Sequence, residues 1–406
     1  MTNVCQPSSS LLSTASPPQI ALASFANMFS VGTVYALSTL QAELPRLLEV
    51  SHHSSFAPFG SACLGLSSGA GICAPLIAKY GARTMAAQGT AFWGLAVIST
   101  GYFLARSNFQ AILGCLFIGG IGVGWTYLAV IIMIGRGLPS QPLTRSAIGP
   151  LGFSSGTAAC VALSSYYEFS SLSAEKLGQV LNFGGTIFII IGAVTMVLLP
   201  NDAGEHEHSS LPPKALASST DRFFSTLLFF NALPGMVTFS ALLPVVSYYK
   251  GGHVHTGDPL KFLPFGIVTL ALGGLLAPTL SSLLGARSTF VVLFCLRGMM
   301  LIVFSQYPEP EMATITLLTV LFAHGTGFSI LPGLIKAQQV NNREFSYSYG
   351  RVLITWGTAG VVGSLINASL IPLSGEATMA SLVIGLLVLA FGACLYFASS
   401  FGRADL

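Results

Sequence analysis

The sequence of 406 residues has few charged side chains, and this shortage restricts the class of protein more than any motif does. Asp, Glu, Lys and Arg make up only 8% of the chain, against roughly 25% in an ordinary soluble domain. Apolar residues make up 52% of it. A chain of this composition is expected in lipid, and its small net charge of +3 gives no indication of a nucleic-acid partner.

Motifs for catalysis and for cofactors are also absent. No nucleotide-binding loop is present, and the glycine repeats near Gly122 lie inside an apolar run with no strand before it. The pairs His52 with His53 and His253 with His255 have no fixed metal-ligand spacing. We therefore predict no enzyme activity, no cofactor, no metal site and no use of ATP by this chain alone.

Long apolar runs predict an integral membrane protein built from α-helices. A bilayer core about 30 Å thick requires about 20 apolar residues per helix, and continuous runs such as 187–200 exclude the alternating pattern of barrel strands. Twelve stretches meet this requirement. They lie near residues 19–40, 56–78, 84–105, 109–134, 146–168, 178–199, 223–248, 262–284, 288–306, 312–334, 350–372 and 378–400.

The distribution of basic residues predicts the orientation in the membrane. Eleven Lys and Arg residues lie on the side that holds both termini, five lie on the other side, and Arg297 lies within a stretch. The positive-inside rule therefore places both termini in the cytoplasm. The first stretch is expected to be retained, since residues 1–18 carry no Lys or Arg and the stretch is too long for a signal peptide. The plasma membrane is the default location, and an organelle membrane stays open.

Two landmarks recur at nearly the same spacing and predict an internal duplication. Gly81-Ala-Arg83 ends the second stretch, and Gly285-Ala-Arg287 ends the eighth stretch 204 residues later. Arg145 and Arg351, each before a glycine-rich stretch, are 206 residues apart. We therefore predict two six-helix halves. The predicted parts are a tail at 1–18, a bundle at 19–199, a polar linker at 200–222, a second bundle at 223–400 and a tail at 401–406.

The segment from Pro75 to Arg83 resembles the signature loop of the major facilitator superfamily of transporters. Lys79, Gly81 and Arg83 stand in the positions of the signature, and Ala78 replaces the aspartate that the family usually has there. The family uses that aspartate in an ion-pair network at the cytoplasmic face. The resemblance implies the major facilitator fold, with twelve transmembrane helices in two halves, a monomeric functional unit, and alternating access to a small-molecule substrate.

Four further segments contain glycine together with aromatic or basic residues. They are Gly32-Thr-Val-Tyr35-Ala-Leu-Ser38, Gly119-Gly-Ile-Gly122-Val-Gly124-Trp-Thr-Tyr127, Arg145-Ser-Ala-Ile-Gly149 with Gly152 and Gly156, and Tyr349-Gly350-Arg351 with Trp356-Gly357-Thr-Ala-Gly360-Val-Val-Gly363. Through these segments, the chain resembles the group of oxalate/formate antiporters and monocarboxylate porters within that superfamily. This resemblance implies a secondary transporter for a small organic anion, a mono- or dicarboxylate, moved by exchange or with protons.

Polar side chains at membrane depth are the candidates for substrate binding, because burying them is costly. The charge and planar fork of Arg297 suit a carboxylate, and the alternative is structural pairing or snorkelling. His324 is suited to bind solute or relay a proton, and the alternative is a hydrogen-bonded core histidine. Interhelical packing is the alternative for the aromatic candidates. The remaining candidates are Tyr35, Tyr127, Trp356, Asn27 and Gln41.

Basic residues at the cytoplasmic ends of the stretches are the candidates for gating, with plain topology charges as the alternative. They are Lys79, Arg83, Arg145, Arg287 and Arg351.

Two other functions stay open at this point. One is proton-coupled efflux of a larger apolar metabolite or drug, although the shortage of acids at membrane depth disfavours an antiporter for cations. The other, from a different class, is a membrane sensor that keeps the fold without transporting.

Overall fold

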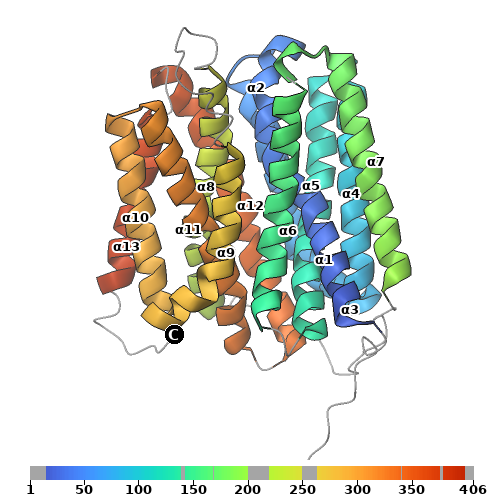
Figure 1. Cartoon of the computed structure of the whole chain (residues 1–406), viewed down its shortest axis with the longest axis vertical. Coiled ribbons are helices and arrows are strands. Elements are labelled where there is room, and N and C mark those ends of the chain that lie inside the picture. The colour runs from blue at the N-terminus through green and yellow to red at the C-terminus, as the bar shows by residue number, and fades with distance from the viewer. Residues whose placement is uncertain are drawn as a thin grey trace, which may run out of the picture.

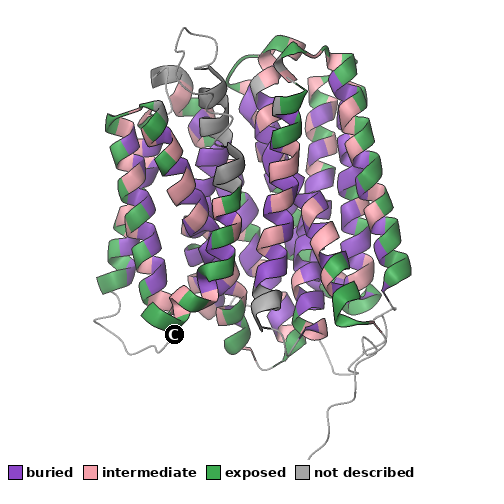
Figure 2. Ribbon diagram, in the orientation of Figure 1, coloured by how far each residue is buried: buried purple, intermediate pink, exposed green. Residues whose placement is uncertain are grey.

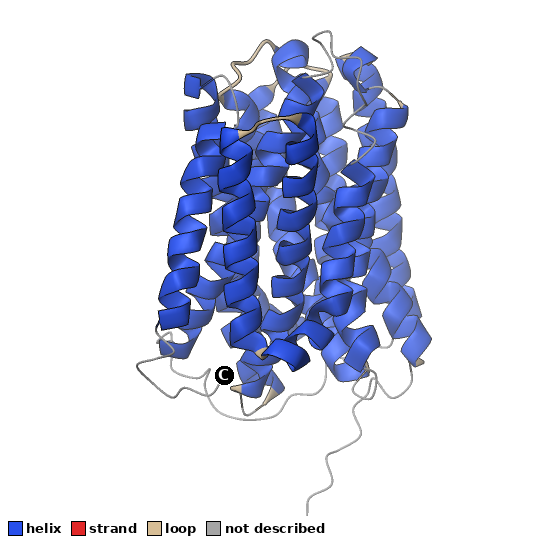
Figure 3. Cartoon of the chain, turned by 60° about the vertical axis from the view of Figure 1, so that its left-hand side comes forward, coloured by secondary structure: helices blue, strands red, loops and turns tan. Residues whose placement is uncertain are grey.

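Apolar segments in lipid have no water to bind their backbone groups, so they pair these groups within the segment as helices. The computed structural model describes residues 15–138, 142–167, 169–199, 219–248, 263–339, 341–374 and 378–397. Every regular element in these ranges is a helix (Figure 3). The predicted tail at 401–406, most of the tail at 1–18 and most of the linker at 200–222 lie outside the described residues, as do His253 and His255.

Eleven of the twelve predicted stretches coincide with one helix each, and the first covers α1, η2 and the start of α2. The all-α membrane fold class is confirmed. The N-terminal half contains α1 (Pro17–Gly32), η2 (Thr33–Ala36), α2 (Leu37–Leu48), η3 (Ser54–Phe56), α3 (Ala57–Tyr80), α4 (Ala82–Leu104), α5 (Phe109–Gly137), α6 (Pro142–Tyr166), η4 (Phe169–Ser171) and α7 (Ala174–Leu198). The C-terminal half contains α8 (Ser219–Tyr248), α9 (Leu263–Leu284), α10 (Ala286–Gln306), α11 (Pro310–Ala337), α12 (Asn342–Ser374) and α13 (Thr378–Phe397).

Nine helices of the described part of the chain are long and apolar enough to cross a membrane. The outward face of α7 is apolar where a water-soluble protein would be polar, with Phe183 71% and Val197 83% exposed. Buried residues face the interior of the bundle and exposed residues cover its outside (Figure 2). An exposed apolar belt of this kind is expected to face lipid tails. The chain is therefore a multi-pass integral membrane protein.

The helices run side by side along the long axis, with the N-terminal half on one side and the C-terminal half on the other (Figure 1). The main contacts between the halves join α3 with α12, α6 with α9, and α2 with α8. Helix α1 begins and α13 ends at the same end of the bundle, which is the lower end in Figure 1. The division into two domains and the cytoplasmic location of this end stay predictions.

The repeated Gly-Ala-Arg motifs have the same backbone conformation. Gly81 has a φ of 85° and Gly285 a φ of 78°, values that L side chains rarely adopt. Each glycine separates two helices, α3 from α4 and α9 from α10. The arginine two residues later then donates to carbonyl groups at the end of the last helix of its own half. Arg83 reaches Leu199 O at 2.6 Å, and Arg287 reaches Leu395 O at 2.7 Å.

The first predicted stretch is not one continuous helix. Helix α1 ends at Gly32, the 3-10 turn η2 follows, and α2 continues to Leu48, beyond the predicted end near residue 40. A side chain at position 32 would collide with the backbone of Phe153 in α6. The Thr157 hydroxyl group donates to Gly32 O at 2.8 Å. The close approach of α6 thus accompanies a change of helix type at the segment that carries Tyr35.

Candidate functional site

Tyr35 lies where the two halves of the molecule meet. Its hydroxyl oxygen is 3.0 Å from His324 Nε2 in α11, and the two groups share a hydrogen bond. Trp356 Nε1 in α12 donates to the same oxygen at 3.1 Å. One hydroxyl group of the N-terminal half thereby binds two helices of the C-terminal half.

Aromatic rings surround this hydrogen-bonded group. Trp356 packs against Tyr127, with ring centroids 4.7 Å apart, and Tyr35 packs against Phe239 at 4.3 Å. All of these side chains are buried. We call this set the central aromatic cluster, and it consists of Tyr35, Tyr127, Phe153, Phe239, His324, Phe328 and Trp356.

The second nitrogen of His324 has no hydrogen-bond partner, although the residue is only 3% exposed. Nδ1 faces Gly235 in α8, where any side chain would collide with the imidazole ring. Buried polar atoms are nearly always hydrogen-bonded, so an unpaired one calls for an explanation. A free imidazole nitrogen is able to bind a solute, a water molecule or a proton once the ring moves.

Arg297 is completely buried in the C-terminal half. Its Nη1 donates to Asn231 O at 2.9 Å, and its Nη2 donates to Asn231 Oδ1 at 3.2 Å. The guanidinium group lies over the ring of Phe294, 4.6 Å from the centroid, and its Nε has no hydrogen-bond partner. Arg297 forms no ion pair with any acid among the described residues. A buried cation without a carboxylate is unusual, because buried charges are normally paired.

The other two polar candidates, Asn27 and Gln41, differ in whether their side-chain amides are hydrogen-bonded. Asn27 lies in the interior of the N-terminal half, where it donates to Thr195 Oγ1 and accepts from Thr90 Oγ1, both at 2.7 Å. These bonds join α1 to α7 and α4. Gln41 is 1% exposed in α2, and both polar atoms of its amide lack a partner. The unpaired amide of Gln41 is thus available for a ligand, whereas the amide of Asn27 is already bonded.

The gating candidates contact different groups. Arg83 and Arg287 cap helix ends within their own halves, as described above. Lys79 lies over the neighbouring Tyr80 ring at 4.9 Å. Arg351 forms an ion pair with Asp221 at 2.5 Å, which joins α12 to the start of α8. Arg145 lies in α6, and its side chain is outside the described residues. A gating role stays a prediction for all five.

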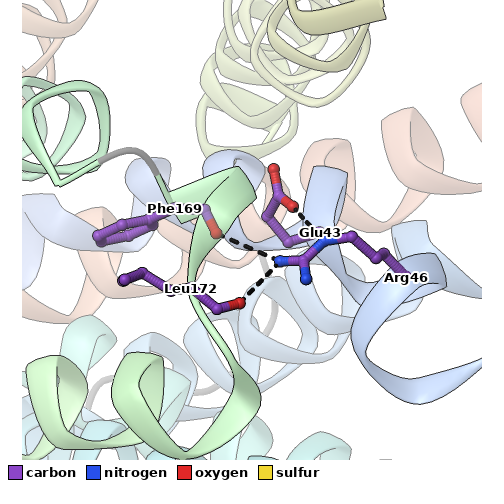
Figure 4. Close-up of polar contacts among 4 residues, drawn as sticks. All are labelled: Glu43, Arg46, Phe169 and Leu172. Carbon is purple, nitrogen blue, oxygen red and sulfur yellow. Dashed lines mark hydrogen bonds and ion pairs between the residues drawn. The ribbon is translucent and has the colours of Figure 1, made fainter.

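The C-terminal end of α2 makes polar contacts with the segment that follows α6, within the N-terminal half. Arg46 lies between the Glu43 carboxylate, at 3.2 Å, and two carbonyl groups of the segment after α6 (Figure 4). These acceptors are Phe169 O at 3.3 Å and Leu172 O at 3.0 Å. The contact holds the end of α2 against η4, and therefore supports the part of the first helix that follows Tyr35.

Sequence analysis missed four residues of this region: Phe153, Phe239, Phe328 and Asn231. The phenylalanines lie in apolar stretches, where a ring facing the centre has the same sequence context as one facing lipid. Asn231 carried a detectable signal, because it is a lone amide within the apolar run from Thr226 to Val237. Such an amide at membrane depth is costly unless it has a partner.

The arrangement of the helices is that of the major facilitator fold. The chain matches the solved structure of XylE, a proton:xylose symporter of the major facilitator superfamily bound to 6-bromo-6-deoxy-D-glucose. The TM-score is 0.73 at 13% identity, over 94% of this chain and 95% of that chain. A mutant form of the nucleoside transporter NupG matches with a TM-score of 0.67 at 15% identity, over 94% of this chain and 98% of that chain. No protein-family model and no curated protein sequence matches the chain.

Proposed function

We propose that the protein is a secondary active transporter that moves a small solute by alternating access between its two halves. The fold supports this proposal, and so does the position of the central aromatic cluster at the contact between the halves. A solute that enters this region must separate Tyr35 from His324 or from Trp356. Binding at that position would therefore bias the arrangement of one half against the other.

The substrate that the site supports best is a small organic anion such as a mono- or dicarboxylate. The observation that carries this assignment is the buried Arg297, which forms no ion pair with an acid of the described chain and reaches the cluster through Asn231 and His324. Hydrogen-bond donors for a carboxylate oxygen lie in the cluster itself, at Trp356 Nε1 and at the Tyr35 hydroxyl group. His324, with Nδ1 unpaired, is the proposed proton site if transport is proton-coupled.

Export of a larger apolar metabolite is the second candidate. It is favoured by the aromatic character of the cluster, in which six of the seven side chains are Phe, Tyr or Trp. The solved structures that share the fold also include a xylose symporter and a nucleoside transporter, so neutral hydroxylated solutes belong in any test. A protein that binds a solute but produces no flux would instead be a sensor.

The test is uptake into proteoliposomes that contain the purified protein, with and without an imposed pH gradient. The labelled solutes are lactate, oxalate, formate and succinate, with xylose and a nucleoside as neutral comparisons. We expect saturable uptake of at least one anion, and a loss of that uptake in Arg297→Ala and His324→Ala. The surface variant Tyr102→Phe controls for reconstitution, because Tyr102 is 48% exposed. Uptake of neutral solutes alone, or none above empty liposomes, would overturn the anion assignment.

A further inference from the structure

Asn231 connects the buried arginine to the central aromatic cluster. It lies in α8 and is 1% exposed; its backbone carbonyl accepts one hydrogen bond from the Arg297 guanidinium group, and its side-chain Oδ1 accepts the other. Its Nδ2 donates to His324 O at 3.4 Å, so the same side chain contacts the helix that carries the histidine. Gly327 in α11 packs directly against the amide, and a side chain there would collide with it. The missing side chain at Gly327 therefore leaves room for a side chain with the shape of asparagine.

Aspartate has that shape, and would form a buried ion pair with Arg297. Asparagine gives the guanidinium group the same acceptor atom without a negative charge. The positive charge of Arg297 is thus held in place but left without a counter-charge among the described residues. In a low-dielectric interior, an unscreened charge acts over several ångströms beyond its hydrogen-bond partners. Its field therefore reaches the neighbouring cluster, where a solute would bind.

We propose that Asn231 determines the charge preference of the transporter by holding Arg297 without neutralising it. The negative charge of the solute then supplies the counter-charge that the protein omits. Arg297 acts on the solute through its field, with Asn231 as the positioning residue. This inference rests on the proposed function, since it requires an anionic substrate. It adds a residue that determines selectivity, and it predicts which substitution changes the preferred charge.

The experiment compares Asn231→Asp with the wild-type protein in the proteoliposome assay, using the best anion found there. We expect KM for the anion to rise at least about tenfold, the factor that corresponds to 1.4 kcal/mol, with a smaller change in kcat. Thermal stability should change little, because the new ion pair with Arg297 offsets the lost hydrogen bond from Asn231 Nδ2 to His324 O. Arg297→Met should raise KM to a similar extent, and Arg297→Lys should raise it less because it keeps the charge.

Asn367→Asp is the matched control. Asn367 is also fully buried, in α12, and its amide donates to Val237 O at 3.1 Å. We expect this variant to change KM far less than Asn231→Asp. An unchanged KM in folded Asn231→Asp would overturn the inference while leaving anion transport intact. If Asn231→Asp does not fold, equal KM values for Arg297→Lys and Arg297→Met would overturn it. A wild-type protein that carries no anion would instead overturn the proposed function itself.

Discussion

Tyr35 connects the halves through one hydroxyl group, so removing that hydroxyl group tests the connection at the scale of a single atom. Tyr35→Phe keeps the ring that packs against Phe239 but leaves Trp356 Nε1 and His324 Nε2 without this partner. Burying unpaired polar groups costs about 1–3 kcal/mol. We therefore expect Tyr35→Phe to lower the free energy of unfolding by about that amount and to reduce uptake. Chemical denaturation in mixed micelles measures the first effect. An unchanged unfolding midpoint would contradict the assigned role of the hydroxyl group.

Asn27 has a different expected role, although it lies two turns from Tyr35 on the same predicted stretch. Its amide makes three hydrogen bonds of 2.7 Å, to Ala23 O, Thr195 Oγ1 and Thr90 Oγ1, and the last two come from other helices. We expect Asn27→Ala to lower the free energy of unfolding by about 1–3 kcal/mol, with a smaller effect on KM than on stability. Gln88→Ala, an exposed amide on α4, is the control and should stay within about 0.5 kcal/mol. A raised KM at unchanged stability would place the Asn27 amide at the substrate.

The sequence identified most members of the central aromatic cluster but not their geometry. Tyr35, Tyr127, His324 and Trp356 stood out as polar or aromatic residues in motif-bearing stretches, and the structure brings all four together. Their role in binding stays a prediction. Asn27 was grouped with them because it precedes Tyr35, yet it faces α4 and α7. Which way a helix face turns depends on packing with helices distant in sequence, and a single stretch does not contain that information.

At the scale of helices, the residue ranges could be predicted from the sequence, but the 3-10 turn that interrupts the first helix could not. Hydropathy located the helices because each needs a long apolar run. The 3-10 turn at Thr33–Ala36 has no proline, and its position is associated with the backbone of α6 against Gly32. The repeated Gly-Ala-Arg motif was recognisable, and the positive φ of Gly81 and Gly285 supplies its physical reason. The motif alone does not predict which carbonyl groups Arg83 and Arg287 bind.

The contact between α3 and α12 depends on glycines, and this allows a test of one helix pair. A side chain at position 357 would collide with Cys63 O and Ser67 Oγ in α3. Gly357→Ala should therefore push the two helices apart and lower the free energy of unfolding by about 1–3 kcal/mol, the range found when a core is overpacked. In a protein with Cys63 as the single cysteine, we expect a maleimide to label this buried thiol several-fold faster.

Gly114→Ala is the control for that measurement, because nothing lies within 4 Å of the added methyl group. It should leave both the stability and the labelling rate of Cys63 close to those of the parent protein. Equal labelling rates in Gly357→Ala and Gly114→Ala would show that the packing of α3 against α12 does not depend on the close approach at position 357.

At the scale of the whole molecule, composition and repetition predicted a duplicated helical membrane protein, whereas the pairs of helices that join the halves came only from the structure. The halves touch through α3 with α12 and α6 with α9, and the helices of each pair are separated by more than ninety residues. Small residues in these helices are compatible with many partners in lipid. The pairing follows from the packing of all the helices together, so no local pattern specifies it.

Alternating access requires the halves to separate at each end in turn, and a cross-link between α3 and α12 tests this requirement. A Cβ atom at position 60 would lie 3.3 Å from Ser364 Cβ, close to the range of about 3.5–4.5 Å found in disulfides. The pair Gly60→Cys with Ser364→Cys, in a background without the native cysteines, should therefore form a disulfide on oxidation. Since the bond joins one half to the other, we expect oxidation to abolish uptake and a reductant to restore it. Each single cysteine variant should transport regardless of oxidant. Full uptake by completely cross-linked protein would mean that the halves do not separate at this end, and the alternating-access mechanism would have to be abandoned.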